Sequence, residues 1–296
     1  MAKIAVELER ALTRRSVEGT PGRAEPRIVA RGDGWTVADV VCTSGPDDRP
    51  FEERHEQFAI AMVLAGTFEY RSAQGQGVMT PGGLMLGNPG HCYECGHEHA
   101  SGDRCVAFWY APDYFERIVG DVGGPALSRG FRHARLPALR PFAPLMARAA
   151  GGATGSIAVA WEELGVFLAA RVAAVDTGAS REARPPRNAV AHVSHAVRAI
   201  ARHPDEPWTL TRLARDARLS PYHFLRTFQN VTGVTPHQFI LRTRLREAAG
   251  RVVEDDINVL DIALDCGFGD VSNFNRAFRE EFGASPSVYR STVRSK

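Results

Sequence analysis

One segment of this chain concentrates residue types that bind metal ions. It reads His91-Cys-Tyr-Glu-Cys-Gly-His-Glu-His99 and is followed by Cys105. Thiolate and imidazole together suit zinc or another transition-metal ion. The Cys-x-x-Cys spacing is that of a metal-binding turn, and an extended backbone would turn Cys95, His97 and His99 to one side, with Cys105 returning on the next strand. We therefore expect a tetrahedral metal site drawn from Cys92, Cys95, Cys105 and either His97 or His99.

Two other interpretations of this segment stay open. Cys92 and Cys95 could form a thiol redox switch. The segment could also be a turn whose side chains serve only packing and hydrogen bonding. The sequence contains five cysteines, which in a reducing compartment are thiols or metal ligands rather than structural disulfides.

A second group of residues lies in a motif that occurs twice in the last third of the chain. The copies run from Trp208 to Pro236 and from Asn258 to Pro286. Each reads as a helix, a short turn and a capped helix, which is the pattern of a helix-turn-helix. Two in tandem predict a protein that spans two turns of DNA. Five residues of the first copy recur in the second: Phe224, Arg226, Phe228, Gly233 and Pro236 match Phe274, Arg276, Phe278, Gly283 and Pro286.

The second helix of each copy has an apolar side and a polar side. Ser220-Pro221 and Asp270 mark the two helix starts, and a Phe pair one turn apart faces inward in each. Cys266 is expected to be a core thiol. Side chains in the first turns of such a helix reach base edges: Arg can bind guanine, Asn or Gln adenine, and Val or Leu a thymine methyl group, although Arg can equally bind phosphate. The predicted DNA-contacting residues are Tyr222, Leu225, Arg226, Gln229, Val271, Ser272, Asn275 and Arg276.

The rest of the chain must position these two groups. Short β-rich runs between turn residues predict an antiparallel barrel or sandwich, as in 35–41, 58–64, 67–71 and 104–110. Helices are expected over 139–150 and 156–175, the second with an apolar stripe of Trp161, Leu164, Leu168 and Val172. Further helices are expected over 190–201 and from about 236 to 253. The predicted domains are 1–175 and 189–296, joined by a Pro- and Gly-containing linker at 176–188.

Composition narrows the functional classes. The 296 residues, 44% hydrophobic and 24% charged, are those of an ordinary globular protein of two domains. No apolar run is long enough to span a bilayer, and the amino terminus lacks a secretion signal, so a cytoplasmic location without membrane contact is expected. The net charge of +2 does not by itself indicate a nucleic-acid partner.

The repeated residues resemble the DNA-binding domain of the AraC/XylS family of bacterial transcription regulators. The family's closing signature is matched by Ile262-Ala263, Gly267-Phe268, Phe274-Asn-Arg-Ala-Phe278 and Phe282-Gly-Ala-Ser-Pro-Ser-Val-Tyr-Arg290. The resemblance implies two helix-turn-helix units on a rigid linker helix that enter successive major grooves. The amino-terminal half resembles the cupin-like sensor barrel of many members, which holds an effector or a dimer contact. The segments that carry this second resemblance are 55–71 and 81–91.

These observations predict an α+β protein: a cupin-like β-barrel with flanking helices, then an all-α domain with two helix-turn-helix units. The expected function is sequence-specific transcriptional regulation, by activation, controlled by a small-molecule or metal effector at the barrel. Expected partners are double-stranded DNA and RNA polymerase, with a homodimer through the 156–175 helix as one interpretation and packing of that helix on the barrel as the other. An organic ligand would meet Trp109, Phe108, Phe68 and Tyr70.

The alternative is an enzyme, either a cupin-like metal enzyme or a DNA-repair alkyl-transfer protein fused to a DNA-binding domain. Neither is favoured, because a second distant cysteine pair and a Gly-rich phosphate loop are both lacking. His55 is expected near the Cys/His segment. The paired His-x-His of metal cupins is not found at Glu53-Arg-His55-Glu56, which argues against an oxygenase-type iron centre. We therefore expect no catalytic residues.

Overall fold

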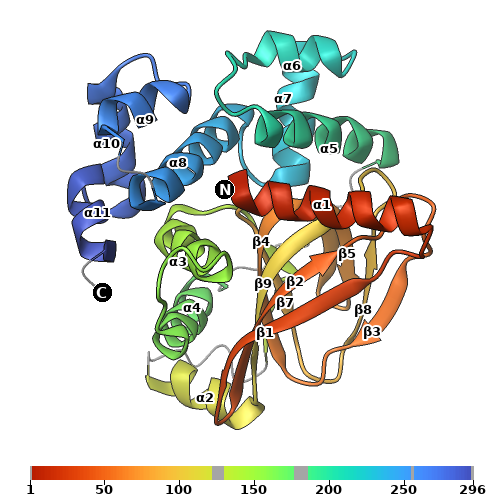
Figure 1. The fold of residues 1–296 in the computed structure, drawn as a ribbon. Coiled ribbons are helices and arrows are strands. Elements are labelled where there is room, and N and C mark those ends of the chain that lie inside the picture. Colours follow the sequence, from red (N-terminus) through yellow and green to blue (C-terminus); the bar gives the residue numbers. More distant parts are fainter. Residues whose placement is uncertain (1, 122–129, 177–185, 255–256, 295–296) are drawn as a thin grey trace.

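The computed structural model describes residues 2–121, 130–176, 186–254 and 257–294. Figure 1 shows strands in the amino-terminal part, a group of helices beside them, and a separate set of helices at the carboxy terminus. Within the described residues, no helix is both long and apolar enough to cross a membrane.

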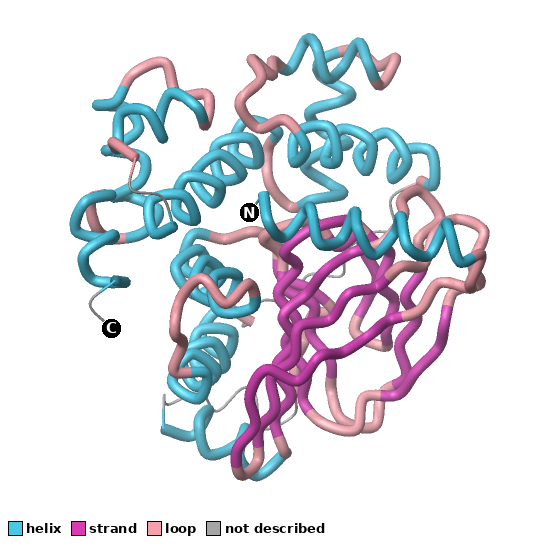
Figure 2. The backbone as a smooth tube through the Cα atoms, viewed as in Figure 1, coloured by secondary structure: helices cyan, strands magenta, loops and turns pink. Residues whose placement is uncertain are grey.

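The strands form two antiparallel sheets (Figure 2). Among the described residues the sheets are hydrogen bonded separately, in the orders β1-β2-β9-β4-β7-β10 and β3-β8-β5-β6, so of the two expected forms, barrel or sandwich, the strands form the sandwich. The strands are β1 (Ala24–Gly32), β2 (Trp35–Cys42), β3 (Phe51–Arg54), β4 (Phe58–Gly66), β5 (Phe68–Ser72), β6 (Gly75–Met79), β7 (Leu84–Gly87), β8 (Cys92–Gly96), β9 (Asp103–Tyr110) and β10 (Arg135–Leu136).

The six-stranded sheet is covered on both faces. Because side chains alternate along a strand, Ile60 and Met62 of β4 point to one interior and Ala61 and Val63 to the other. The first interior lies under helices α1 (Ala2–Glu18), α2 (Pro112–Asp121), α3 (Ala143–Ala153) and α4 (Trp161–Val175). The second lies between the two sheets. This double covering explains the unbroken apolar run of β4.

Helix α4 begins five residues later than expected, and its apolar stripe packs inside the protein. The helix starts at Trp161, and residues 156–160 precede it. Leu164, Leu168 and Val172 are completely buried in the core against the six-stranded sheet. The interpretation that this stripe packs on the strands is therefore confirmed, and its use as a dimer face is wrong, because its own chain already covers it. The helix expected over 139–150 is a 3₁₀ turn, η1 (Arg140–Phe142), followed by α3.

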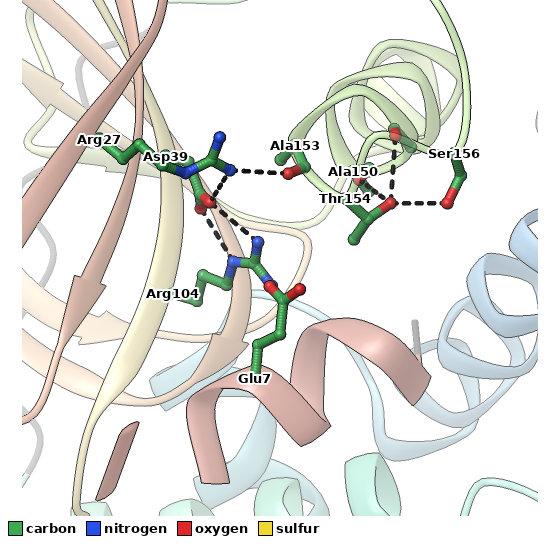
Figure 3. A network of polar contacts seen from close by, with 9 residues as sticks. Glu7, Arg27, Asp39, Arg104, Ala150, Ala153, Thr154 and Ser156 are labelled. Atoms are coloured by element: carbon green, nitrogen blue, oxygen red, sulfur yellow. Dashed lines mark hydrogen bonds and ion pairs between the residues drawn. The ribbon is translucent and has the colours of Figure 1, made fainter. Parts of the chain in front are cut away.

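A buried ion pair ties this sheet to the helices above it (Figure 3). Arg104 of β9 is 1% exposed, and its Nε and Nη2 donate to the two carboxylate oxygens of Asp39 on β2 at 2.8 and 2.9 Å. Glu7 of α1 pairs with the same guanidinium. Arg27 of β1 donates to Asp39 and to the carbonyl of Ala153 at the end of α3. The network thus joins three strands and two helices.

The carboxy-terminal part is entirely helical where the structure describes it. Its helices are α5 (Arg187–Arg202), α6 (Leu210–Asp216), α7 (Pro221–Thr232), α8 (Pro236–Glu254), α9 (Val259–Asp265), α10 (Val271–Phe282) and α11 (Pro286–Arg294). Residues 177–185 of the predicted linker lie outside the described residues. Its two ends do not belong to a linker: Asp176 is buried and accepts from Arg132 N at 2.7 Å, and α5 already begins at Arg187.

The buried pair gives a first prediction. Asp39→Ala would leave Arg104 buried without its bidentate partner, so we expect the free energy of unfolding, measured by urea denaturation, to fall by about 3–5 kcal/mol. The matched control is Arg27→Ala, which removes the mostly exposed partner of the same carboxylate and should cost less than about 1 kcal/mol. Equal losses in the two variants would contradict the assignment of Arg104–Asp39 as the stabilising pair.

Candidate nucleic-acid interface

The first helix-turn-helix unit consists of α6 and α7. Thr209 and Ser220 cap the two helices by accepting from backbone N–H groups three residues on, and Pro221 occupies the first position of α7, where its missing N–H costs nothing. Phe224 and Phe228 are completely buried, with ring centroids 5.7 Å apart. Leu213 and Ala214 form the buried face of α6, Ala217 just after the helix is also buried, and Leu210 is half-buried.

The second unit, α9 and α10, repeats this construction. Asp270 accepts from Ser272 N and Asn273 N at 3.0 and 2.9 Å, and these backbone bonds lower the pKa of its carboxyl group. Phe274 and Phe278 are completely buried. Gly267 holds the turn at φ +84°, where a Cβ would lie 2.7 Å from the carbonyl oxygen of Asp205. A side chain there would therefore strain the turn and collide with the segment before α6.

The predicted DNA-contacting residues line the solvent side of α7 and α10. In α7, Tyr222 is 61% exposed, Arg226 and Gln229 are exposed, and Leu225 is half-buried. In α10, Ser272 and Arg276 are exposed, while Val271 and Asn275 are half-buried. The two helices thus present matching faces, with Arg226 and Arg276 at equivalent positions.

Both arginines are held by neighbours on their own helix. The Arg226 guanidinium donates to the Tyr222 hydroxyl at 3.2 Å, with its carbon 5.9 Å from the ring centroid. Arg276 donates to Asn273 Oδ1 at 2.9 Å. These contacts orient the two guanidinium groups along the exposed face before any ligand binds.

Helix α8 joins the two units, and one of its arginines fixes them together. Arg244 donates to three carbonyl oxygens: Pro204 at 2.7 Å, Glu206 at 2.8 Å and Gly267 at 2.8 Å. The first two belong to the segment that leads into α6, and the third belongs to the turn of the second unit. Sequence reasoning did not single out Arg244, because its role depends on contacts with residues 40 and 23 positions away.

The amino-terminal part also contacts the second recognition helix. Arg140 of η1 lies 3.0 Å from Glu280 and 3.6 Å from Glu281 of α10. Glu281 is buried and is also 3.5 Å from Arg242 of α8. Burial raises the pKa of Glu281 despite these arginines. Arg242 in turn donates to the carbonyl of Ala138. The position of α10 is thereby linked to the domain that precedes it.

The structure does not assemble the metal site expected from the Cys/His segment. Cys92 and Cys95 are three apart on strand β8, so they lie on opposite faces: Cys92 is exposed and Cys95 is buried. They therefore form neither the corner of a tetrahedral site nor a close redox pair. His99 lies 3.9 Å from Glu69. Burial raises the pKa of Cys95 and of Cys105.

His97 and Cys105 of the expected set do come together, with two residues that the spacing did not indicate. His97 Nε2 lies 2.8 Å from Asp103 Oδ1, and the Cys105 thiol donates to Asp103 Oδ2 at 3.2 Å. Cys42 of β2 is beside them. Burial would lower the pKa of His97, but Asp103 and Cys42 outweigh it and raise the pKa to about 9. Only the pairing of β2 with β9 could have identified Cys42.

A cavity of about 200 Å³ lies between the sheets next to this cluster. Its lining includes Cys95, Cys105 and His55, which confirms the expectation that His55 lies near the segment. His55 is 3.0 Å from the Tyr70 hydroxyl, and burial, followed by the charge of His91, lowers its pKa to about 4.

Two of the four aromatic residues expected around an organic ligand line this cavity, namely Phe68 and Trp109. Phe108 instead belongs to the core against the helices, because its side chain lies on the other face of β9.

The contacts of Arg244 give a second prediction. Arg244→Lys replaces a planar fork with a single ammonium group, which cannot reach three separate carbonyls. We expect the free energy of unfolding of the carboxy-terminal part to fall by roughly 2 kcal/mol, observed as a lower midpoint in thermal unfolding. Arg276→Lys, on the exposed face, should stay within about 0.5 kcal/mol of the parent. An unchanged midpoint for Arg244→Lys would show that these three bonds contribute little.

Comparison with known proteins bears on the last third of the chain. A family model described as a helix-turn-helix domain matches residues 213–292. An uncharacterized HTH-type transcriptional regulator of Haemophilus influenzae is 35% identical over 98 residues, 33% of each chain. The RCS-specific HTH-type transcriptional activator RclR of Escherichia coli is 36% identical over 91 residues, 31% of this chain and 32% of the relative. The similarity thus spans about a third of these relatives' length.

Among solved structures, the DNA-binding domain of AdpA in complex with a target DNA aligns with 29% identity over 35% of this chain and 93% of that chain, at a TM-score of 0.34. The family match and the two named regulators cover the segment that contains both recognition helices. Residues 213–292 therefore form a helix-turn-helix domain of the AraC/XylS family of transcription regulators.

Proposed function

We propose that this protein is a sequence-specific DNA-binding transcriptional regulator. The observation that carries the proposal is the presence of two helix-turn-helix units, each with a side-chain cap, a buried Phe pair and an exposed arginine at the equivalent position, fixed to one helix. A packing repeat alone would not require an exposed arginine at the same position of both units. The similarity of this region to named transcriptional regulators favours a regulator over an enzyme.

The length of α8 suits two adjacent major grooves. Its 19 residues correspond to a rod of roughly 28 Å at 1.5 Å per residue. Successive major grooves on one face of B-DNA are about 34 Å apart. Arg244 holds the turn of the second unit against the segment before the first, so the two recognition helices meet DNA as one body. Pre-ordering of this kind lowers the entropic cost of binding.

Each recognition helix offers one side chain for strong base recognition and others for contacts that position the protein. Arg226 and Arg276 can each donate two bonds to guanine, while Gln229 and Asn275 suit adenine. Leu225 and Val271 suit a thymine methyl group. The hydroxyls of Tyr222 and Ser272 can donate to phosphate oxygens, which fix register without reading sequence.

Control of DNA binding is assigned to the amino-terminal part. The cavity between the sheets is the proposed place for an effector, and the contact of Arg140 with Glu280 is a route from that part to α10. Activation through RNA polymerase is proposed because a relative that matches this region is named as an activator. A homodimer, if it forms, requires a surface other than the buried stripe of α4.

The DNA-binding proposal gives a third prediction. After the operator is selected from genomic fragments, Arg276→Ala should weaken binding to it about tenfold or more, since a bidentate base contact discriminates by about 1–3 kcal/mol. The loss should be larger for the operator than for unrelated DNA, and the thermal midpoint should not change. Fluorescence anisotropy at fixed salt measures both affinities.

The matched control is Arg31→Ala, which removes an exposed arginine of β1 far from both recognition helices and should leave both affinities unchanged. If Arg226→Ala and Arg276→Ala each stay within twofold of the parent on the operator, the recognition helices do not read DNA through these residues.

A further inference from the structure

The space between the two sheets contains a buried group of sulfur, nitrogen and oxygen atoms. Cys42 of β2 and Asp103 of β9 are directly opposite each other in the antiparallel pairing of these strands. Opposite residues of an antiparallel pair point to the same side of the sheet. Their side chains are therefore neighbours on the face that looks toward the four-stranded sheet. Cys105, two residues after Asp103, lies on this face as well.

The facing sheet supplies the remaining group. His97 follows β8 directly, two residues after Cys95, which is buried between the sheets. The imidazole is 1% exposed and approaches Asp103 from across the interior. Cys42 and Asp103 of the six-stranded sheet therefore meet His97, which comes from the four-stranded sheet, and the cluster requires both sheets.

The distances fit the first coordination sphere of a small metal ion. Cys42 Sγ, one ring nitrogen of His97 and one carboxylate oxygen of Asp103 all lie within 4.8 Å of one another. Tetrahedral zinc, with bonds of about 2.0–2.3 Å, holds its ligand atoms roughly 3.3–3.8 Å apart. Small rotations of these three side chains would bring their ligand atoms to the spacing required by the ion. The Cys105 sulfur lies 3.2 Å from Asp103 Oδ2 and is a candidate for a further ligand.

We propose that Cys42, His97 and Asp103 bind a zinc-class transition-metal ion, with Cys105 as the fourth ligand. This site goes beyond the proposed DNA-binding function, and the metal can be measured without DNA.

The bonding of His97 supports this assignment. Its Nδ1 atom is buried and has no hydrogen-bond partner among the residues that the structure describes. The other ring nitrogen, Nε2, lies 2.8 Å from Asp103 Oδ1, so it is the atom that would bind an ion shared with that carboxylate.

The ligand types select the class of ion. Thiolate and imidazole favour zinc, cobalt, nickel or copper, whereas magnesium and calcium prefer oxygen atoms alone. Cys42, Asp103 and Cys105 also line the cavity between the sheets, so a small molecule there would lie next to the ion. The other nearby group, Glu69, Glu98 and His99, is partly exposed and dominated by carboxylates, and it carries no proposal.

The test uses the full chain purified without chelators and without a tag. Elemental analysis should find about one zinc-class ion per chain. After removal of the metal, added Co²⁺ should give the thiolate-to-cobalt charge-transfer band in the near ultraviolet and the intense visible bands of tetrahedral cobalt. Cys42→Ser and His97→Gln should each lower the bound metal at least tenfold at equal free metal and abolish the charge-transfer band or reduce it strongly.

Two controls separate ligand loss from misfolding. Cys92→Ser removes the exposed thiol on the opposite face of β8, and Cys266→Ser removes the core thiol of the carboxy-terminal domain. Both should bind metal as the parent does. Asp103→Asn keeps the side-chain shape but weakens the ligand, so its circular dichroism spectrum should match that of the parent while its metal affinity falls.

Three results would overturn the proposal. One is a parent chain that takes up neither zinc nor cobalt at micromolar free metal. Another is metal that is lost equally in Cys92→Ser and Cys42→Ser. The third is a disulfide between Cys42 and Cys105 in the freshly isolated protein.

Discussion

Strand β9 constrains the whole amino-terminal part, because it lies inside a sheet that is covered on both faces. Every polar side chain on such a strand must find its partner within the protein. On the face toward the helices, Arg104 meets Asp39 and Glu7. On the face toward the second sheet, the neighbouring Asp103 meets His97 and Cys105. Two consecutive residues therefore join β9 to two separate interiors.

The Arg104 network and the Asp103 cluster therefore lie next to each other on opposite faces of β9. The Arg104 network reaches α1 and the end of α3, and α1 also packs on β4. The Asp103 cluster reaches the cavity between the sheets. A ligand that shifts β9 by a fraction of an ångström changes contacts on both faces, since close-packed interiors transmit displacement rather than absorb it. The strand thus connects a pocket to α1 and to α3, and α3 contacts α8 and α10 of the DNA-binding domain.

The DNA-binding domain is organised differently. Residues close together in the chain determine the structure of each helix-turn-helix unit, and a few contacts between distant residues determine the relative position of the two units. The cap of the second helix, the Phe pair and the C-cap glycine (Gly233 or Gly283) recur at the same spacing, and each acts within one unit. The relative position of the units depends on Arg244, whose carbonyl partners come from both. In the same way, the ion pair of Arg140 with Glu280 connects the amino-terminal part to α10.

Local pattern in the sequence determined the recognition helices, their caps and their exposed faces, because a helix-turn-helix is stabilised by residues close together in the chain. The alternating strands of the amino-terminal part were also predictable, as was the approach of His55 to the Cys/His segment. Only the tertiary structure decided that the sheets form a sandwich, that the stripe of α4 is internal, and that Cys42 and Asp103 rather than Cys92 join His97. The physical reason is strand pairing: register brings together residues some sixty positions apart, and alternation within β8 separates two cysteines that are only three apart.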